Sequence, residues 1–202
     1  LRSVRDKAIT YFSEVIEDQD KEFNKLYKAV NKFGEQVKRV AEEDRKNLEA
    51  SGLKFNLFAI VGGQLEEDEE PKLYLLYPQG NWIEIGQGTP FVIIGNSGFG
   101  TPILKRSLTY NTSLEFGLKG GFLSFDATRI SANDVDYPID TVVLKKNEFN
   151  IREHRFHERD LGHIADFWNT KLSSAIDKLP ADALNNAFAN DQEQDVITTD
   201  AT

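Results

Sequence analysis

The stretch from residue 55 to residue 101, FNLFAIVGGQLEEDEEPKLYLLYPQGNWIEIGQGTPFVIIGNSGFGT, decides the fold of this chain. It contains apolar runs at residues 55–61, 72–77, 81–86 and 91–94, which are rich in β-branched and aromatic residues. Turn-forming residues such as Pro78-Gln79-Gly80 separate the runs. Short strands joined in this way form an antiparallel meander. The stretch therefore predicts four strands of one antiparallel sheet.

Helical patterns precede this sheet. Apolar residues recur every three or four positions over residues 2–16 and 21–51, and Asp20 is placed to cap the second of these helices. Gly52 supplies the C-terminal stop. The apolar stripe of the second helix fits either a coiled coil or a long helix that lies on a sheet. The helix on a sheet is favoured, because the stripe is irregular and rich in aromatic residues and because a sheet follows directly.

After the sheet, the pattern predicts three helices and two further strands. The expected helices cover residues 101–108, 112–130 and 158–179, and the expected strands cover residues 138–145 and 147–156. Thr112 and Glu115 form a capping box at the start of the middle helix. Gly117, Gly120 and Gly121 are unfavourable inside a helix and predict the close approach of another backbone. Blocks of helices and strands, rather than an alternation, predict an α+β fold with antiparallel sheets.

The composition is typical of a globular protein with an acidic surface. The chain has 202 residues, a formal net charge of −9 and no cysteine. This charge disfavours nucleic acid and anionic membranes as partners, because both bind basic surfaces. No apolar run approaches the roughly 20 residues of a transmembrane helix, and no secretory signal pattern opens the chain. We therefore expect a cytoplasmic protein with a single domain over residues 1–180 and a polar, disordered tail over residues 181–202.

Three local patterns could carry chemistry, and each has a plainer interpretation. The loop at residues 95–101 lacks the lysine of a P-loop and the glycine order of a dinucleotide site, so a tight structural connection is favoured. The three histidines, His154, His157 and His163, are better explained as an exposed polar cluster than as a metal site. The acidic run at residues 66–70 lacks the alternating ligands of a calcium loop, so a solvated hairpin loop is favoured. We expect no cofactor and no bound metal.

Hydroxyl and carboxyl side chains also gather near the end of the helix expected at residues 112–130. They are Ser124, Asp126, Thr128, Ser131 and Asp134. No histidine lies near them in the sequence, although catalytic triads assemble from distant positions. The residues taken alone therefore predict a soluble α+β domain and leave its function open.

Several segments carry a resemblance to a known family. They are Phe33-Gly34-Glu35-Gln36-Val37, Gly62-Gly63-Gln64, Leu73-Tyr74-Leu75-Leu76-Tyr77-Pro78-Gln79-Gly80-Asn81-Trp82-Ile83, Gly100-Thr101-Pro102-Ile103-Leu104, Leu123-Ser124-Phe125-Asp126-Ala127-Thr128 and Pro138-Ile139-Asp140. In order and spacing these segments resemble the bacterial proteasome-type proteases called Anbu, the ancestral beta subunit. The resemblance implies a four-layer αββα sandwich of antiparallel sheets, of the N-terminal-nucleophile hydrolase type.

The same resemblance implies an activity. In this family a threonine at the mature N-terminus attacks the peptide carbonyl and uses its own α-amino group as the base. Leu1 has no hydroxyl, and the family's nucleophile and first strands precede its first helix, so we expect both upstream of residue 1 and no catalytic residue within residues 1–202. The resemblance also implies a homo-oligomer that acts on peptides or unfolded proteins, and it leaves an ATPase partner open.

Four positions match the family's supporting residues imperfectly. Asn96 stands where the family has the serine of a Gly-Ser-Gly turn, and Ser97 follows it. Ser131 and Asp134 replace the aspartate and the serine of an Arg-Asp-x-x-Ser-Gly-Gly segment. These departures keep a non-catalytic structural subunit of the same fold open as the alternative. An acidic α+β interaction module unrelated to this family is a third interpretation.

Overall fold

The structure is a computed structural model that describes residues 2–19, 23–182 and 184–187. The chain forms two compact units, of which the first ends at His157 and the second begins at Glu158. The expectation of one domain over residues 1–180 stays a prediction. Most of the tail expected from residue 181 lies outside the described residues.

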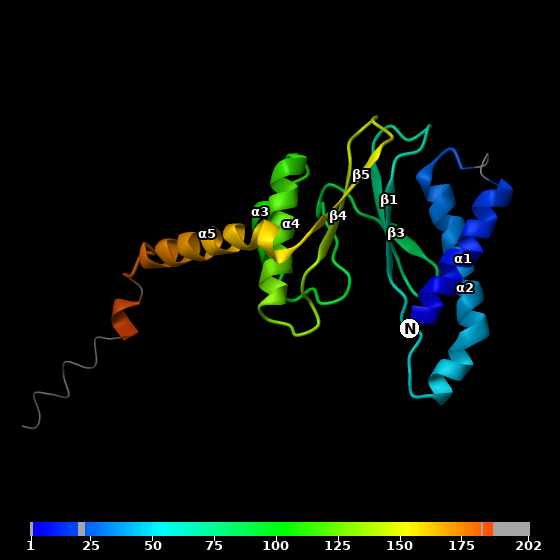
Figure 1. Cartoon of the computed structure of the whole chain (residues 1–202), viewed down its shortest axis with the longest axis horizontal. Coiled ribbons are helices and arrows are strands. Elements are labelled where there is room, and N and C mark those ends of the chain that lie inside the picture. Colours follow the sequence, from blue (N-terminus) through cyan, green and yellow to red (C-terminus); the bar gives the residue numbers. More distant parts are fainter. Residues whose placement is uncertain (1, 20–22, 183, 188–202) are drawn as a thin grey trace, which may run out of the picture. The chain divides into compact units, whose positions relative to one another are not determined.

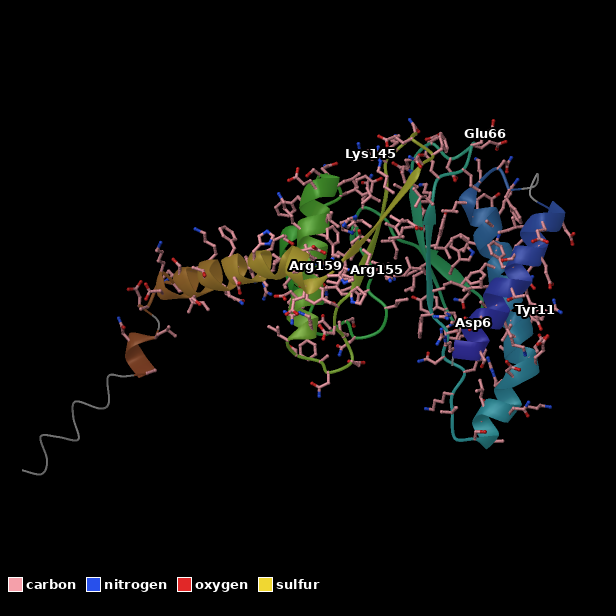
Figure 2. The ribbon with its side chains drawn as sticks, viewed as in Figure 1. Asp6, Tyr11, Glu66, Lys145, Arg155 and Arg159 are labelled. Carbon is pink, nitrogen blue, oxygen red and sulfur yellow. The ribbon has the colours of Figure 1, made fainter. Side chains whose placement is uncertain are left out.

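Helices α1 (Arg2–Gln19) and α2 (Leu26–Ala50) pack against each other. Tyr11 of α1, labelled in Figure 2, donates its hydroxyl hydrogen to the Glu43 carboxylate of α2 at 2.9 Å. The buried residues of α2 recur every three or four positions, as the sequence predicts: they are Leu26, Val30, Gly34, Val37, Val40 and Ala41. This stripe lies over the first sheet and shares one core with α1 and with strand β2.

The first sheet contains β1 (Ala59–Gly63), β2 (Lys72–Leu76) and β3 (Trp82–Glu84), in that order and antiparallel. Ala59 of β1 pairs with Leu76 of β2, and Leu76 pairs in turn with Trp82 of β3. Alternate side chains of β2 point to the core under α2, where Tyr74 and Leu76 are buried. This alternation fixes the register of the sheet beneath the helices.

The second sheet pairs β4 (Ile139–Leu144) with β5 (Ile151–Phe156) in an antiparallel ladder. Helix α3 (Thr101–Ser107) contacts helix α4 (Leu114–Arg129). Figure 1 shows α1 and α2 on one side of the first sheet, the second sheet on its other side, and α4 beyond the second sheet. The α+β class with layers in the order helix, sheet, sheet, helix is therefore confirmed.

The second compact unit contains α5 (Glu158–Asp177) and a short 3-10 helix (Asn185–Ala187). Leu161 and Ala165 are buried in α5, whereas Leu172 and Ile176 are exposed. No helix in the described part of the chain is long and apolar enough to cross a membrane.

Residues 91–94 were expected to form a fourth strand, and this prediction is wrong. The segment has the apolar, β-branched composition of a strand, but among the described residues no strand pairs with it. A strand needs a neighbour that accepts and donates its backbone hydrogen bonds, and an apolar run alone does not supply one. The first sheet therefore has three strands instead of four.

The N-terminus of helix α2 is closed by a carboxylate from a distant loop. Asp20, the cap expected from the sequence, lies outside the described residues. Its N-cap residue is Lys25, whose side chain makes no capping bond. The Asp68 carboxylate accepts hydrogen bonds from the backbone N–H groups of Leu26 at 3.0 Å and Leu65 at 2.9 Å. The acidic run is therefore not only a solvated loop, because one of its carboxylates closes the N-terminus of α2.

The cap of α4 is one residue away from the expected position. Ser113, not Thr112, is the N-cap, and its hydroxyl oxygen accepts a hydrogen bond from the Phe116 backbone at 3.2 Å. The Thr112 hydroxyl instead accepts from the Thr109 backbone at 2.9 Å. Two hydroxyl residues in succession both suit a cap, and the preceding turn uses the first of them.

The glycines of α4 were expected to meet another backbone, and this prediction is also wrong. A Cβ added at Gly117 or Gly121 would have no neighbour within 4 Å, and one at Gly120 would meet only side-chain atoms. The close approaches occur elsewhere. A Cβ at Gly34 would overlap the Gly80 carbonyl oxygen, and one at Gly100 would overlap the Ser124 hydroxyl.

A buried amide joins the two sheets. Gln64, which follows β1, is 6% exposed. Its side-chain nitrogen donates to the Asn147 side-chain oxygen at 2.8 Å, and its side-chain oxygen accepts from the Asn147 backbone at 2.7 Å. Asn147 lies in the β4–β5 turn with φ at 62°. The pair therefore fixes the end of the second sheet to the end of β1.

Replacing Gln64 by alanine is expected to lower the free energy of unfolding by about 1–2 kcal/mol, because both bonds to Asn147 are lost from a buried site. Urea unfolding measures the change. Gln87→Ala is the matched control, because Gln87 is exposed and none of the described hydrogen bonds involves its side chain. Equal effects of the two substitutions would contradict the role assigned to Gln64.

Candidate functional site

The first pair of candidate residues lies in the loop before α3. Asn96 and Ser97 are exposed. The Ser97 carbonyl oxygen accepts hydrogen bonds from the Thr101 backbone at 3.2 Å and from the Thr101 hydroxyl at 2.6 Å. This loop therefore forms the entry to α3, which agrees with the structural connection favoured from the sequence.

The second pair lies in the loop after α4. Ser131 and Asp134 are exposed, and the Ser131 backbone donates to the Thr128 carbonyl oxygen at 3.0 Å. In the described part of the chain, no hydrogen bond or ion pair joins these two side chains to Asn96 or Ser97. The supporting role of all four residues stays a prediction.

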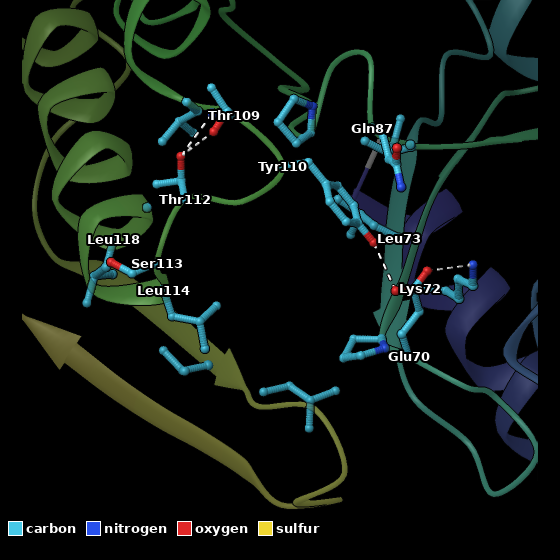
Figure 3. Close-up of a pocket in the computed structure, with 18 of the residues that line it drawn as sticks. Glu70, Lys72, Leu73, Gln87, Thr109, Tyr110, Thr112, Ser113, Leu114 and Leu118 are labelled. Carbon is cyan, nitrogen blue, oxygen red and sulfur yellow. Dashed lines mark hydrogen bonds and ion pairs between the residues drawn. The ribbon is translucent and has the colours of Figure 1, made fainter.

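A large cavity opens inside the first unit. Its volume is about 730 Å³, and it lies between β2 and β3 on one side and α4 and β4 on the other. Figure 3 shows Leu114 and Leu118 of α4 on one wall and Lys72 with Glu70 on the opposite wall. One wall is thus apolar, and the other carries charge.

The charged wall is a network around Lys72. Its ammonium nitrogen lies 2.9 Å from the Glu84 carboxylate and 3.3 Å from the Glu70 carboxylate. The Tyr110 hydroxyl donates to Glu70 at 3.0 Å. These contacts join β2 and β3 to the loop before α4. Sequence reasoning missed them, because Tyr110 and Glu70 are 40 positions apart and the acidic run that contains Glu70 gives no sign of its partner.

The contacts of this wall hold its ionisable groups in their ordinary charge states. The contacts with Glu84 and then with Glu70 raise the pKa of Lys72, so its amine stays protonated and is not a base. The bond to Glu70 raises the pKa of Tyr110, which keeps the phenol neutral. The bonds from Tyr110 and Lys72 lower the pKa of Glu70, which keeps it ionised. The network therefore holds the cavity wall together and keeps its three ionisable groups in their ordinary charge states.

Replacing Glu70 by glutamine is expected to flatten the acid side of the stability–pH curve. The pKa of Glu70 is lower in the folded state than its ordinary value of 4.5. Its stabilising effect is therefore complete above that value and is lost as the pH falls through the folded-state pKa. Thermal unfolding of both proteins between about pH 7 and about pH 3 measures the difference.

The control for this prediction is Glu69→Gln, which removes the same charge from an exposed neighbour in the same run. It is expected to leave the steepness of the acid side close to that of the unmodified protein. If Glu69→Gln and Glu70→Gln change the curve alike, general charge repulsion explains the effect and the network does not.

The remaining candidate patterns supply no reactive cluster. His154 lies on β5, where its ring packs against Phe156 at 4.3 Å between centroids, and His163 lies on α5 in the second unit. Among the residues that the structure describes, no three His, Asp or Glu side chains are grouped to hold a metal ion. Ser124, Asp126 and Thr128 are buried within α4, where Asp126 pairs with Arg129 at 2.9 Å.

A second cavity, of about 550 Å³, lies between the two sheets. Apolar side chains line it from both sheets, and they are poorly covered. Ile60 of β1 is 38% exposed, Val142 of β4 is 64% exposed and Ile151 of β5 is 58% exposed. Sandwich cores are normally closely packed, whereas the facing sides of these two sheets leave apolar surface uncovered in the described residues.

Comparisons with known proteins match this architecture. No protein-family profile matches the chain, and no curated protein matches it in sequence. Among solved structures, the chain is similar to the Pseudomonas aeruginosa protein described as the helical assembly of the Anbu complex. The two share 30% identity with a TM-score of 0.80, over 88% of this chain and 76% of that one.

Two further structures give similar values. Anbu, the ancestral beta-subunit, from Yersinia bercovieri shares 29% identity with a TM-score of 0.79, over 88% of this chain and 76% of that one. Anbu from Hyphomicrobium sp. strain MC1 shares 30% identity with a TM-score of 0.74, over the same shares of the two chains, 88% and 76%. Proteins from three bacteria are therefore similar to this chain in both sequence and fold.

Proposed function

The chain belongs to the Anbu family of proteasome-like subunits, and on that premise we propose that it is a subunit of a self-assembled threonine peptidase. The nucleophile in this proposal is a threonine upstream of residue 1, whose α-amino group acts as its base. The substrates are peptide bonds of peptides or unfolded proteins. The subunit acts in the cytoplasm, and an ATPase that delivers substrate is left open.

The observation that carries the proposal is the similarity to Anbu structures over 88% of the chain, at 30% identity and a TM-score of 0.80. The uncovered apolar surface between the sheets supports it. Strands that carry the nucleophile would cover Ile60, Val142 and Ile151 and complete the sandwich. In such an arrangement the cavity beside α4 would be occupied by chain rather than by solvent.

Self-assembly is part of the same proposal. The similar protein from Pseudomonas aeruginosa is described as a helical assembly. We expect the present chain to form a homo-oligomer as well, with each copy contributing one active centre. Light scattering after size-exclusion chromatography tests this without reference to activity, and a strictly monomeric protein at all concentrations would contradict it.

The activity is tested on the protein expressed from its complete gene. A threonine-directed peptide epoxyketone is expected to add one inhibitor mass per subunit, located by mass spectrometry on an N-terminal threonine. Replacing that threonine by alanine should abolish both the adduct and peptide cleavage. If the unmodified protein neither forms the adduct nor cleaves peptides, the peptidase assignment fails.

A second candidate is a non-catalytic structural subunit of the same fold. It is favoured by the exposure of Asn96, Ser97, Ser131 and Asp134 and by the lack of hydrogen bonds among their side chains in the described part of the chain. Asn96→Ser is the discriminating change. If the protein is inactive and stays inactive with serine at this position while assembling normally, the structural role is supported.

A further inference from the structure

A basic groove lies along α2, on a protein whose net charge is −9. Its volume is about 500 Å³. It is lined by Lys38, Ala41, Glu42, Arg45 and Lys46 of α2 and by Pro78 and Gln79 of the β2–β3 turn. Three cations and one carboxylate give the groove a local charge of about +2.

The cations of this groove are available to a partner. Most other basic side chains of the first unit are held in ion pairs, such as Lys7 with Asp44 and Arg155 with Asp140. Within the described residues, Lys38, Arg45 and Lys46 form no ion pair, and Arg45 lies over the Phe55 ring at 5.6 Å. An acidic group that enters the groove would therefore not have to displace an existing partner.

The same sequence contains an acidic segment with matching charge. Residues 188–202, which lie outside the described residues, contain Asp191, Glu193, Asp195 and Asp200 and no basic residue. The first three acids alternate with glutamine. In an extended chain, alternate side chains point to the same side. If residues 191–195 bind in an extended conformation, they would present three carboxylates on one side over about 13 Å.

The spacing of the groove cations agrees with this length. Lys38 and Arg45 are seven positions apart on α2, which puts them on one face of the helix and about 10.5 Å apart along its axis. Lys38 and Lys46 are about 12 Å apart along the axis. An extended segment from 191 to 195 would span about 13 Å. The carboxylates at its two ends could thus reach the cations at the two ends of the groove.

We infer that the α2 groove is a docking site for residues 191–195 of a second copy of this chain. The inference rests on the self-assembly proposed above, because a single contact of a few exposed charges is weak and gains strength when many copies are held together. Attraction between exposed charges is screened by salt, so the contact weakens as ionic strength rises. Each subunit then offers one groove and one acidic segment to its neighbours.

The direct test uses a fluorescein-labelled peptide of residues 188–202 and the full chain in which Asp191, Glu193 and Asp195 are changed to Asn, Gln and Asn. Fluorescence anisotropy at low salt is expected to show saturable binding that weakens at least tenfold at high salt. Lys38→Glu with Lys46→Glu in the full chain is expected to weaken binding at least tenfold. A peptide that does not bind, or that binds this variant equally, overturns the inference.

Two controls separate the groove from general charge. Lys105→Glu with Arg106→Glu reverses the same charge at another exposed basic patch, and it should leave peptide binding unchanged. A peptide with lysine at positions 191, 193 and 195 should bind the Lys38→Glu, Lys46→Glu chain again. Equal loss from both double variants, or no rescue by the lysine peptide, counts against the groove.

The oligomer gives a result that is independent of the peptide assay. If neutralising the three acids leaves an oligomer of unchanged size and strength, self-assembly stands and docking of the segment fails. The unmodified chain could also be monomeric while the peptide still binds the α2 groove. In that case the proposed self-assembly fails, and the segment is bound within one chain rather than by a second copy. That last result also overturns the inference.

Discussion

Replacing Gly34 by alanine is expected to destabilise the protein by about 3 kcal/mol. The added Cβ would overlap the carbonyl oxygen of Gly80, and the Leu76 side chain lies 3.4 Å away on the same side. Gly80 has φ at 76° and would place its own Cβ 2.5 Å from the Gly34 carbonyl oxygen. Because the obstacle is main chain, no side-chain rotation relieves it. Urea unfolding measures the loss.

The matched control is Gly117→Ala, which adds the same methyl group near the N-terminus of another helix, α4. No atom lies within 4 Å of that Cβ. Alanine has the higher helix propensity, so this change is expected to stabilise the protein by about 0.5–1 kcal/mol. Opposite signs for the two substitutions support the Gly34–Gly80 contact, whereas a small loss in both would refute it.

Replacing Asp68 by alanine is expected to lower the free energy of unfolding by about 2–3 kcal/mol, because two charge-assisted hydrogen bonds to backbone N–H groups are lost together. One of those N–H groups belongs to Leu26, at the first turn of α2, where a carboxylate also interacts favourably with the helix dipole. The other belongs to Leu65 and holds the loop that carries Asp68. Thermal unfolding monitored by circular dichroism measures the loss.

Glu69→Ala is the control, because it removes one negative charge from the next residue, which is exposed. It is expected to change the free energy of unfolding by less than about 0.5 kcal/mol. Asp68→Asn keeps an oxygen acceptor without the charge and should fall between the two. If alanine at 68 and alanine at 69 behave alike, the cap is not formed in solution.

The sequence predicts the helices and strands of this fold better than it predicts which segments contact one another. The helical stripe of α2 follows from local periodicity, and the strand β2 follows from its apolar composition; the structure confirms both elements. The failures concern contacts between distant segments. Residues 91–94 have the composition of a strand but lack a strand beside them, and the cap of α2 comes from Asp68, 42 positions away from Leu26. Neither fact is encoded locally.

The same limit applies to close backbone contacts and to the candidate site. Glycines inside a helix suggested a close approach at α4, but the approach involves Gly34, whose partner Gly80 is distant in the sequence. The Lys72 network joins β2, β3 and the loop before α4, so no spacing rule reveals it. The resemblance to the Anbu family identifies Asn96 and Ser131 as positions that correspond to its supporting residues. Their roles in this chain stay predictions.

The contact between Gly34 and Gly80 has a mechanical consequence for the surface of α2. Gly80 directly follows Pro78 and Gln79, which form one wall of the basic groove, while Lys38 on the opposite wall lies one helical turn after Gly34. The backbones of Gly34 and Gly80 are in direct contact, so the two walls of the groove are expected to keep a fixed separation. Substitutions of Lys38, Arg45 or Lys46 are therefore expected to change the charge of the groove and leave its width the same.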